Sequence, residues 1–403
     1  MSISFDLTIE QESVRKEAYE FAREQIAPLI AEIDEKDDSA LVLSIHKKMA
    51  QPPYSYTGIW IPKEYDGTPR SLLENCIITE ELAAGGLAGI GVVIIEVLGV
   101  GVALPILIGG RQEQKRKYLP LIARGEAFGS FGLTEPGIGS DAGALTTRAV
   151  LRNNVYVLNG RKRYESFAHI ADFNVIFAKT SPEKGAKGIS AFIIPKETPG
   201  FRVVERVPCI GLRGHQDEEV ELKDCRIPKE NLIGEEGKGL KYALSTHDKT
   251  RTSVTGGFIG LARAALEEAV KFARARKAFS QPISEFQAVS FPLTEVAIAI
   301  EAARLLTYRA AWLSDRGERH TVETAAAKVF ASDLLIKATN VAIDVHGGFG
   351  GTKRFPVERM LRDARIWVFA QGAPNIMKLI VMRDLFKRLE PPQSLLNQVA
   401  ARG

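Results

Sequence analysis

Residues 128–144 read FGSFGLTEPGIGSDAGA, and the character of the chain changes at this stretch. Before it, residues 6 to about 125 place apolar side chains at spacings of three and four, which is typical of amphipathic helices. Thr8 and Gln11 have the spacing of a helix-capping box. From residue 128 to about 234, short β-rich runs alternate with turn residues, and helical periodicity returns from residue 239 onward. The order is helices, strands, helices.

This order predicts an α+β protein with three closely packed parts. We expect an N-terminal helical domain over residues 1–126, a central antiparallel β domain over residues 127–236 and a C-terminal helical bundle over residues 237–403. No internal repeat and no low-complexity linker separates them.

The composition is that of a folded chain without a dominant charge. Of 403 residues, 45% are hydrophobic and 25% are charged, which excludes disordered, collagen-like and disulfide-scaffold proteins. Lys and Arg total 53 against 49 Asp and Glu, so we expect no nucleic-acid partner. The three cysteines lack CxxC spacing and paired histidines, so we expect no metal site and a reducing cytoplasmic location. The N-terminus does not have the pattern of a signal peptide.

One apolar segment is long enough to cross a membrane. Residues 83–110 read AAGGLAGIGVVIIEVLGVGVALPILIGG and carry a single charge, Glu96. Pro105 and many glycines interrupt this run and no second span exists, so we favour a buried helix pair over a membrane span. An ionisable side chain in such surroundings is costly, and we expect the pKa of Glu96 to be raised.

The glycine-rich turn TEPGIGSD, residues 134–141, is the densest group of unusual residues in the β region. Gly137 and Gly139 would let the backbone approach a planar or phosphorylated ligand, and Thr134 and Ser140 offer hydroxyls. The turn matches neither the GxGxxG pattern nor the Walker A pattern, so it indicates neither a Rossmann site nor a P-loop.

Several motifs follow this turn in a fixed order. They are YESFAHIADF (164–173), GLRG (211–214), GEEGKGL (234–240), HDKTRTSV (247–254), RKAFSQPISEFQ (276–287), DVHGGFG (344–350) and PVERMLRDAR (356–365). Together with TEPGIGSD they resemble, in order and approximate spacing, the motifs of the flavin-dependent acyl-CoA dehydrogenases. The resemblance covers essentially the whole chain and implies an acyl-CoA dehydrogenase-like fold, bound FAD and an acyl-CoA substrate. Acyl-CoA oxidases and nitroalkane oxidase share this fold.

The resemblance assigns residues to the flavin and to the substrate. It implies that Tyr164 covers the flavin where the family usually has Trp, and that Ser166 meets flavin N5 where the family usually has Thr; both substitutions keep the necessary chemistry. The segment along the isoalloxazine ring matches Leu133, Thr134, Gly139 and Ser140, with Ser140 also near the pantetheine of the substrate. The substrate-binding turn at the start of a long helix matches Asp248, Lys249, Thr250 and Arg251.

A further group implies an oligomer. Residues that reach the FAD of a neighbouring subunit match Arg276, Phe279 and Gln287, and the pyrophosphate contact matches Gly347, Gly348 and Gly350. We therefore expect a homotetramer, with an electron-transferring flavoprotein as the usual partner of the family. Asp344 departs from a common Gln in the adenine and ribityl region.

The carboxylate that removes the α-proton in this family is missing at both of its usual positions. The segment FAQGAPN, residues 369–375, places Gln371 where most members have Glu, and an amide cannot accept that proton. Other members carry the Glu before the long C-terminal helix, where this chain has Thr250. Ala373 and Asn375 replace a flavin-contacting Thr and a common polar residue, which indicates a remodelled pocket.

Four accounts of the missing base stay open at this point. In the first, Glu96 is the base; the alternative is a structural Glu96 that is hydrogen-bonded to backbone or to Gln371. The resemblance places Glu96 near the deep end of the acyl pocket, which would suit 1,4-dehydrogenation of a cyclic or unsaturated acyl-CoA. In the second, a redox-neutral desulfinase or decarboxylase needs no base, but residues 83–110 offer no cation for the second anion of its substrate. In the third account, the base is Glu165 or Glu135. We expect Glu165 to face away on its strand and Glu135 to be structural. The fourth is a non-catalytic flavoprotein.

Overall fold

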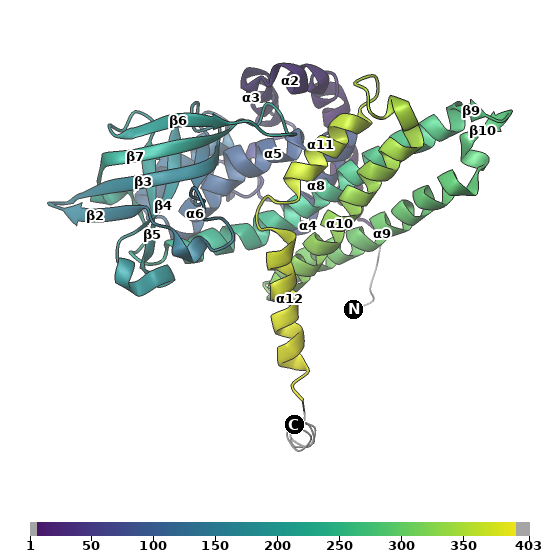
Figure 1. The fold of residues 1–403 in the computed structure, drawn as a ribbon. Helices are drawn as coiled ribbons and strands as arrows, with labels where there is room; N and C mark the ends of the chain where they lie inside the picture. The colour runs from purple at the N-terminus through teal and green to yellow at the C-terminus, as the bar shows by residue number, and fades with distance from the viewer. Residues whose placement is uncertain (1–5, 392–403) are drawn as a thin grey trace.

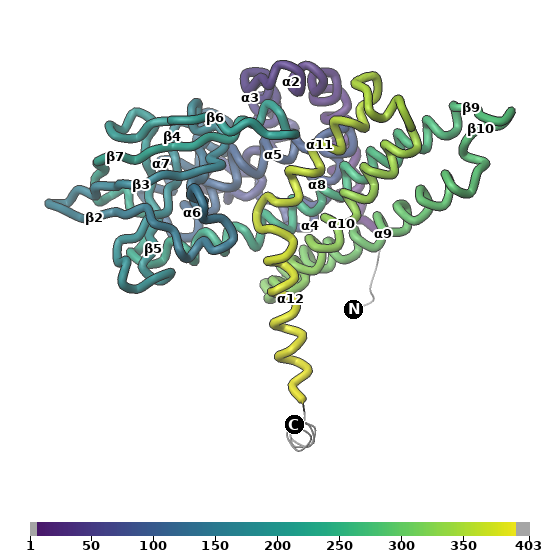
Figure 2. Tube along the Cα trace, in the orientation of Figure 1, coloured from purple at the N-terminus to yellow at the C-terminus, as the bar shows by residue number. Residues whose placement is uncertain are grey.

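The computed structural model describes residues 6–391 and has the expected three-part arrangement. Figure 1 shows the sheet at one end of the molecule and the long C-terminal helices at the other, with N-terminal helices packed beside both. The trace in Figure 2 passes from the N-terminal helices into the sheet and then returns through the long helix α8 (Gly239–Ala275). The predicted fold class is confirmed.

The N-terminal part is helical because its apolar residues form buried stripes. The predicted capping box opens the first helix: Thr8 N donates to Gln11 Oε1 over 3.0 Å, and Gln11 N donates to Thr8 Oγ1 over 3.2 Å. The helical elements of this part are α1 (Ile9–Phe21), η1 (Ala22–Ile26), α2 (Ile30–Lys36), α3 (Ser39–Met49), η2 (Tyr56–Gly58), η3 (Lys63–Tyr65), α4 (Leu72–Gly86), α5 (Ile90–Val93), η4 (Ile94–Val100), α6 (Gly101–Gly109) and α7 (Gln112–Ala123).

The β part forms a single sheet in the order β6-β7-β3-β2-β4-β5-β8, with β1 paired to β4. Most neighbours are antiparallel as expected, but β1 and β2 each pair with β4 in parallel. A parallel pair needs a long connection, and the β2–β3 excursion between β1 and β4 supplies one. The strands are β1 (Gly129–Gly132), β2 (Arg148–Arg152), β3 (Val155–Ser166), β4 (Phe173–Lys179), β5 (Ile189–Pro195), β6 (Phe201–Val207), β7 (Asp217–Pro228) and β8 (Leu232–Ile233), with short helical turns η5 (Ala142–Ala144), η6 (Pro182–Gly188) and η7 (Lys229–Asn231) between them.

The C-terminal part packs long helices against α4 and against one another. A short hairpin joins α8 to the next helix, and the last helix projects away from the rest of the molecule in Figure 1. The elements after α8 are β9 (Lys277–Ala278), β10 (Gln281–Pro282), η8 (Ile283–Glu285), α9 (Gln287–Asp315), α10 (Thr321–His346), η9 (Gly347–Phe349), α11 (Val357–Trp367) and α12 (Pro374–Arg388).

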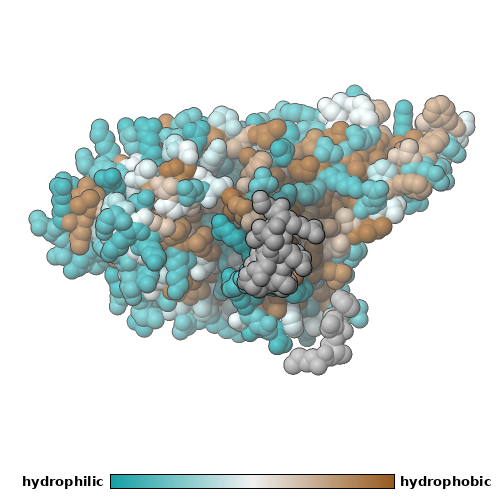
Figure 3. Space-filling model, turned by 60° about the horizontal axis from the view of Figure 1, so that its bottom comes forward, coloured by the Kyte–Doolittle hydropathy of each residue, from teal (hydrophilic) through white to brown (hydrophobic). Residues whose placement is uncertain are grey.

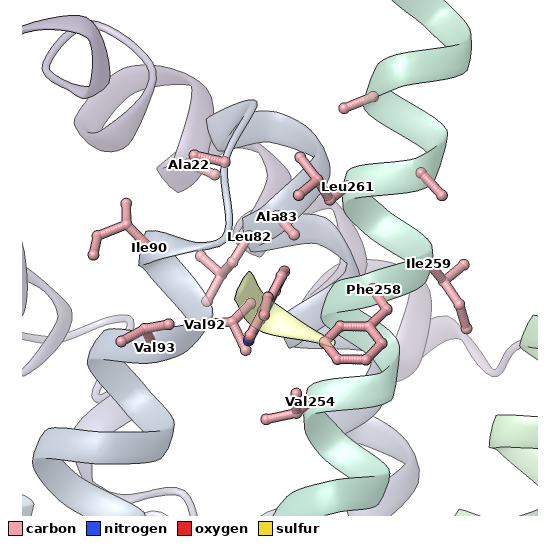
Figure 4. Packing of buried hydrophobic residues seen from close by; sticks show 14 of the residues in the cluster. Ala22, Leu82, Ala83, Ile90, Val92, Val93, Val254, Phe258, Ile259 and Leu261 are labelled. Carbon is pink, nitrogen blue, oxygen red and sulfur yellow. The ribbon is translucent and has the colours of Figure 1, made fainter. Parts of the chain in front are cut away.

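The core joins α8 to the N-terminal helices. Figure 4 shows Val254 and Phe258 on α8 directed toward Val92 and Leu82. Gly257 permits this approach, because a Cβ there would lie 2.7 Å from the Trp367 ring and 2.9 Å from Val92 Cγ2. These contacts tie three segments that are far apart in the sequence into one core.

The apolar segment that could be mistaken for a membrane span lies inside the protein. Ile90–Gly109 is long and apolar enough to cross a bilayer, but 89% of its most apolar window is buried. The segment is a run of α-helix interrupted by the π-helical turns of η4, and it packs on α8 and on the sheet. The interpretation as a buried core segment is confirmed.

Candidate functional site

The glycine-rich turn after β1 leaves an open backbone surface. A Cβ on Gly137 or Gly139 would meet no other atom of residues 6–391 within 4 Å, and Gly137 has a φ of +82°. Ser140 is exposed, whereas Leu133 is buried at the base of the turn. The turn is tied to β3 because Arg163 N donates to Thr134 O over 2.9 Å. This surface can receive a flat ligand without displacing a side chain.

A β-bulge in β3 turns Tyr164 outward beside this surface. The pairing of β3 with β7 shifts between Lys162 and Glu165, and Tyr164 has a φ of +57°. The tyrosine is 52% exposed. Ser166 follows at the end of the strand, and its Oγ donates to Asp217 Oδ1 over 2.9 Å. The bond from Arg163 to Thr134 therefore places the bulged part of β3, which carries Tyr164, next to the start of the glycine-rich turn.

Glu135 has a structural position. Its carboxylate pairs with Lys162 Nζ at 2.8 Å and accepts the backbone N–H groups of Thr146 and Thr147 at 2.6 and 2.9 Å. Burial alone would raise its pKa, but the ion pair and these threonines outweigh burial and lower the pKa of Glu135 to about 2. A carboxylate held in this way is a poor proton acceptor.

Glu165 lies on the opposite side of β3 from Tyr164, as expected. Its carboxyl is fully buried near Ser130, and its Oε2 lies only 2.7 Å from where a Cβ on Gly132 would stand. Burial raises the pKa of Glu165 to about 8. The side chain is therefore directed into the domain rather than toward the open surface.

Glu165→Gln is expected to flatten the dependence of stability on pH. The folded-state pKa of about 8 lies above the ordinary value of 4.5, so the folded protein keeps a proton that the unfolded chain releases. This stabilisation is complete below the unfolded pKa and is lost as pH rises through 8, at up to about 1.4 kcal/mol per pH unit. Between pH 6 and 8 the variant should lose about 2 kcal/mol less than the unmodified protein in urea unfolding. Glu113→Gln on the surface is the control, and equal slopes for all three proteins would contradict the prediction.

The predicted substrate residues lie inside α8 rather than in a turn before it. The helix begins at Gly239, so residues 248–251 stand well within it. Arg251 is buried, and its guanidinium donates to Asp248 Oδ1 at 3.1 Å and to Gln371 O at 2.8 Å. Thr250 is also buried and donates to Thr246 O, whereas Lys249 is exposed. The helix thus brings Arg251 and the loop of Gln371 together.

Gln371 stands in the loop between α11 and α12. Its backbone has a φ of +55°, and Gly372 follows with a φ of +109°. The buried Gln371 Oε1 has no hydrogen-bond partner within the described part of the chain. Ala373 is the N-cap of α12, and Asn375 is exposed in its first turn. The loop therefore leaves the amide oxygen of Gln371 unused as a hydrogen-bond acceptor within residues 6–391.

Glu96 is a buried carboxyl without a hydrogen-bond partner in the part of the chain that the structure describes. It lies in the π-helical turns of η4 with 2% of its surface exposed. Burial raises its pKa to about 8, and Ser253 on the facing helix α8 partly offsets this shift. The two groups do not meet hydrogen-bond geometry, so among residues 6–391 both carboxyl oxygens and Ser253 Oγ lack partners. The alternative, a bond from Glu96 to backbone or to Gln371, is not present within residues 6–391.

A second group of predicted residues lies at the far end of the molecule. Phe279 is 89% exposed at the β9–β10 hairpin, and the Arg276 guanidinium lies 5.9 Å from the Phe349 ring. Gly347 and Gly348 are open to the surroundings, and Gln287 begins α9 nearby. Figure 1 shows this hairpin at the end opposite the sheet. The structure gathers Arg276 with the 347–350 glycines and keeps both apart from Tyr164.

Two residues of the site were missed by the sequence analysis. Lys328 on α10 is fully buried with its Nζ at the Gln371 loop, and His247 on α8 is half-buried beside Phe131 at 5.4 Å between rings. Lys328 sits in the run AAAKVF, where the helical period alone does not distinguish a buried lysine from a surface one. The burial of Lys328 is seen only in the structure, where the loop of residues 368–372 packs over its Nζ.

Comparison with known proteins agrees with this geometry. The family models of the acyl-CoA dehydrogenase N-terminal, middle and C-terminal domains match residues 8–126, 130–225 and 237–386. A probable acyl-CoA dehydrogenase, YngJ of Bacillus subtilis, is 39% identical over 96% of this chain and 100% of its own length. The CarC subunit of the caffeyl-CoA reductase-Etf complex of Acetobacterium woodii is 37% identical over 93% of this chain and 98% of its own.

Solved structures are similar over the same extent. Butyryl-CoA dehydrogenase of Megasphaera elsdenii superimposes with a TM-score of 0.89 at 34% identity, covering 95% of this chain and 100% of the other. The FAD complex of PigA superimposes with a TM-score of 0.91 at 28% identity, covering 96% and 100%. The open glycines and the outward aromatic ring fit FAD, which would supply the hydride acceptor. The chain belongs to the acyl-CoA dehydrogenase family and is a FAD-dependent enzyme of that family.

Proposed function

We propose that this acyl-CoA dehydrogenase uses Glu96 as an atypical base, acting on a cyclic or unsaturated acyl-CoA by 1,4-dehydrogenation. The observation that carries the proposal is the buried carboxyl of Glu96, without a partner among residues 6–391, in a chain with Gln371 and Thr250 at the two usual Glu positions. A carboxyl kept in apolar surroundings without hydrogen bonds costs stability. Glu165 is in the same state within residues 6–391, so the choice of Glu96 rests on its place in the apolar segment that packs on α8.

The surroundings of Glu96 suit a proton acceptor. With a pKa near 8, a fraction of the side chain is ionised at neutral pH, and the carboxylate is basic enough to hold the proton that it removes. Glu96 lies in η4, within the apolar segment that the resemblance assigns to the deep end of the acyl pocket. A base at that depth would reach a hydrogen more remote than the one on Cα. Conjugation with the thioester through a double bond makes such a γ-hydrogen acidic.

The remaining site residues are proposed in the roles that the family implies. The flavin would be held by Leu133, Thr134, Gly139, Ser140, Tyr164, Ser166, Ala373 and Asn375, and the acyl-CoA by Ser140, Asp248, Lys249, Thr250 and Arg251. Supporting this assignment, Tyr164 and the glycine-rich turn share one open surface, and Arg251 contacts the Gln371 loop.

An anaerobic screen of acyl-CoAs tests the proposed function. Linear, branched, dicarboxylic, cyclic and unsaturated acyl-CoAs are mixed with the FAD-loaded protein, and flavin absorbance and product mass are measured. We expect cyclic or unsaturated thioesters to bleach the flavin and to yield a product that has lost two hydrogens. Faster bleaching by saturated straight-chain acyl-CoAs would contradict the proposal.

A redox-neutral desulfinase or decarboxylase of the same superfamily is the second candidate. The apolar segment offers no cation, but the buried guanidinium of Arg251 lies at the Gln371 loop, where an amide has replaced a carboxylate. A second anion on the acyl group would find a cation there. Loss of sulfur dioxide or carbon dioxide without flavin bleaching would identify this activity, and a non-catalytic flavoprotein would give neither signal.

We propose a homotetramer in which each FAD is shared between subunits. The β9–β10 hairpin with Arg276 and Phe279 lies at the end opposite the sheet, whose strand β3 carries Tyr164 (Figure 1). Arg276 lies beside Phe349, so this group, Arg276, Phe279, Gln287, Gly347, Gly348 and Gly350, would serve the FAD of a neighbour. Exposed apolar side chains recur every seventh residue along α9 at Phe291, Ile298, Leu305 and Trp312. Figure 3 shows more brown surface on the helical half than on the sheet. Such a stripe is typical of a helix that packs against another chain.

We further propose an electron-transferring flavoprotein as the redox partner and a cytoplasmic location. The CarC relative belongs to a reductase–Etf complex, which supports this choice of partner.

A further inference from the structure

The loop that carries Gln371 is held through its backbone carbonyls by two cations from two different helices. Lys328 Nζ on α10 donates to Gly372 O at 2.6 Å, to Val368 O at 3.5 Å and to Ala370 O. Arg251 Nε on α8 donates to the intervening carbonyl of Gln371 at 2.8 Å. Successive carbonyls of one short loop thus point alternately at α10 and at α8.

The surroundings of Lys328 make the loop its main partner. The side chain is fully buried, lies 5.8 Å from the Phe258 ring and forms no salt bridge within residues 6–391. An ammonium group has three N–H donors, and three carbonyl oxygens face it. Burial and the charge of Arg251 lower its pKa to about 7, whereas carbonyl acceptors favour the charged form. His247 and Asp248, the latter paired with Arg251, are the other titratable groups near by on α8.

The loop needs such support because its backbone is unfavourable. Gln371, a residue with a Cβ, has a φ of +55°, a region that such side chains adopt only when their surroundings impose it. The buried amide oxygen Oε1 makes no compensating bond within the described chain. The conformation is therefore imposed by the contacts of the carbonyls, not by the side chain.

We infer that Lys328 is the positioning residue of this site: it gathers the carbonyls of residues 368, 370 and 372 and so fixes the direction in which side chain 371 enters the site. The inference adds a residue to the proposed function and rests on it only in treating position 371 as part of the acyl site. The bonds between Lys328 and the loop are independent of which reaction the enzyme performs.

Hydrogen exchange of the FAD-loaded protein tests the clamp without any substrate. Lys328→Met keeps an unbranched side chain that is one atom shorter and removes the ammonium group. We expect amides of residues 366–377 to exchange at least about tenfold faster, with the rest of α8 and α10 little changed. Lys337→Met is the matched control: the same change on the same helix, at a half-exposed lysine that pairs with Glu295. Unchanged exchange of residues 366–377 in Lys328→Met would overturn the inference.

A second variant covers a failure of Lys328→Met to fold. Lys328→Gln keeps an N–H₂ donor for two of the carbonyls. The amides of residues 366–377 should therefore exchange faster than in the unmodified protein and more slowly than in a loop without any donor at position 328. Exchange equal to that of the unmodified protein would again overturn the inference.

Measurement of kcat and KM distinguishes a positioning role of Lys328 from a role in packing alone. Adding Lys328→Met to Gln371→Glu should remove most of any gain in kcat from the new carboxylate, about tenfold or more, with a smaller change in KM, because a displacement of about 1 Å is enough to misalign a base. A gain that survives intact would overturn the positioning role. If Gln371→Glu gives no gain at all, the alignment of position 371 fails, while the exchange experiment still decides the clamp.

Discussion

Gln371→Glu is expected to raise the α,β-dehydrogenation of saturated straight-chain acyl-CoAs by about 10²- to 10⁴-fold, the usual contribution of a well-placed general base. The loop already holds residue 371 in a defined direction through the carbonyl contacts of Arg251 and Lys328. Glu differs from Gln by one atom, so the new carboxylate should enter the site without rebuilding it. The amide oxygen that it replaces has no hydrogen-bond partner in the described chain that would be lost.

The measurement is the anaerobic rate of flavin reduction by a saturated acyl-CoA, followed by turnover with an artificial acceptor. Gln371→Asn is the matched control, because it changes the side chain at the same position but supplies no carboxylate. A rate for Gln371→Glu equal to that of the unmodified protein would show that residue 371 does not correspond to the usual base of the family.

Glu96→Gln is expected to slow flavin reduction by the enzyme's own acyl-CoA by about 10²- to 10⁴-fold. The substitution keeps the volume of the side chain in a fully packed segment and removes only the ability to take a proton. Full flavin reduction by the Glu96→Gln variant would end the assignment of Glu96 as the base.

The pH dependence gives an independent test of Glu96. A base with a pKa near 8 is active when ionised, so the rate of flavin reduction should rise with pH and level off above about 8. That rise should disappear in Glu96→Gln. Glu165→Gln is the matched control, because burial raises the pKa of Glu165 to about 8 as well, but this carboxyl lies inside the sheet domain. The control should retain both the rate and its dependence on pH.

Much of the fold could be predicted because its signals are local. The capping box of Thr8 and Gln11, the helical periods and the β-rich runs each depend on neighbouring residues. The parallel pairing of β4 with β1 and β2 could not be predicted, because it depends on which strands meet after a long connection. The expectation that residues 248–251 stand at the start of the long helix was wrong, since α8 already begins at Gly239. Glycine is a poor helix former, and the sequence does not reveal that Gly239 packs against the backbone of Ser190 and Ala191, where a Cβ would clash.

The site, too, could be predicted only in part from the sequence. The order of the motifs indicated the family, and the resemblance predicts that Gln371 and Thr250 stand where carboxylates are usual. The raised pKa of Glu96 was expected from its apolar neighbours in the sequence and agrees with the structure. The role of Lys328 had no such signal, because its partners lie about forty residues further along the chain.

By itself the sequence determined the family and the three-part layout and predicted that both customary carboxylates are lost, because residue identity and short-range periodicity are written along the chain. Only the tertiary structure decided that Glu96 has no partner among the described residues, that Glu165 turns inward while Tyr164 turns outward, and that Lys328 holds the Gln371 loop. Burial and hydrogen bonding are properties of pairs of distant segments, and they exist only once those segments have packed together.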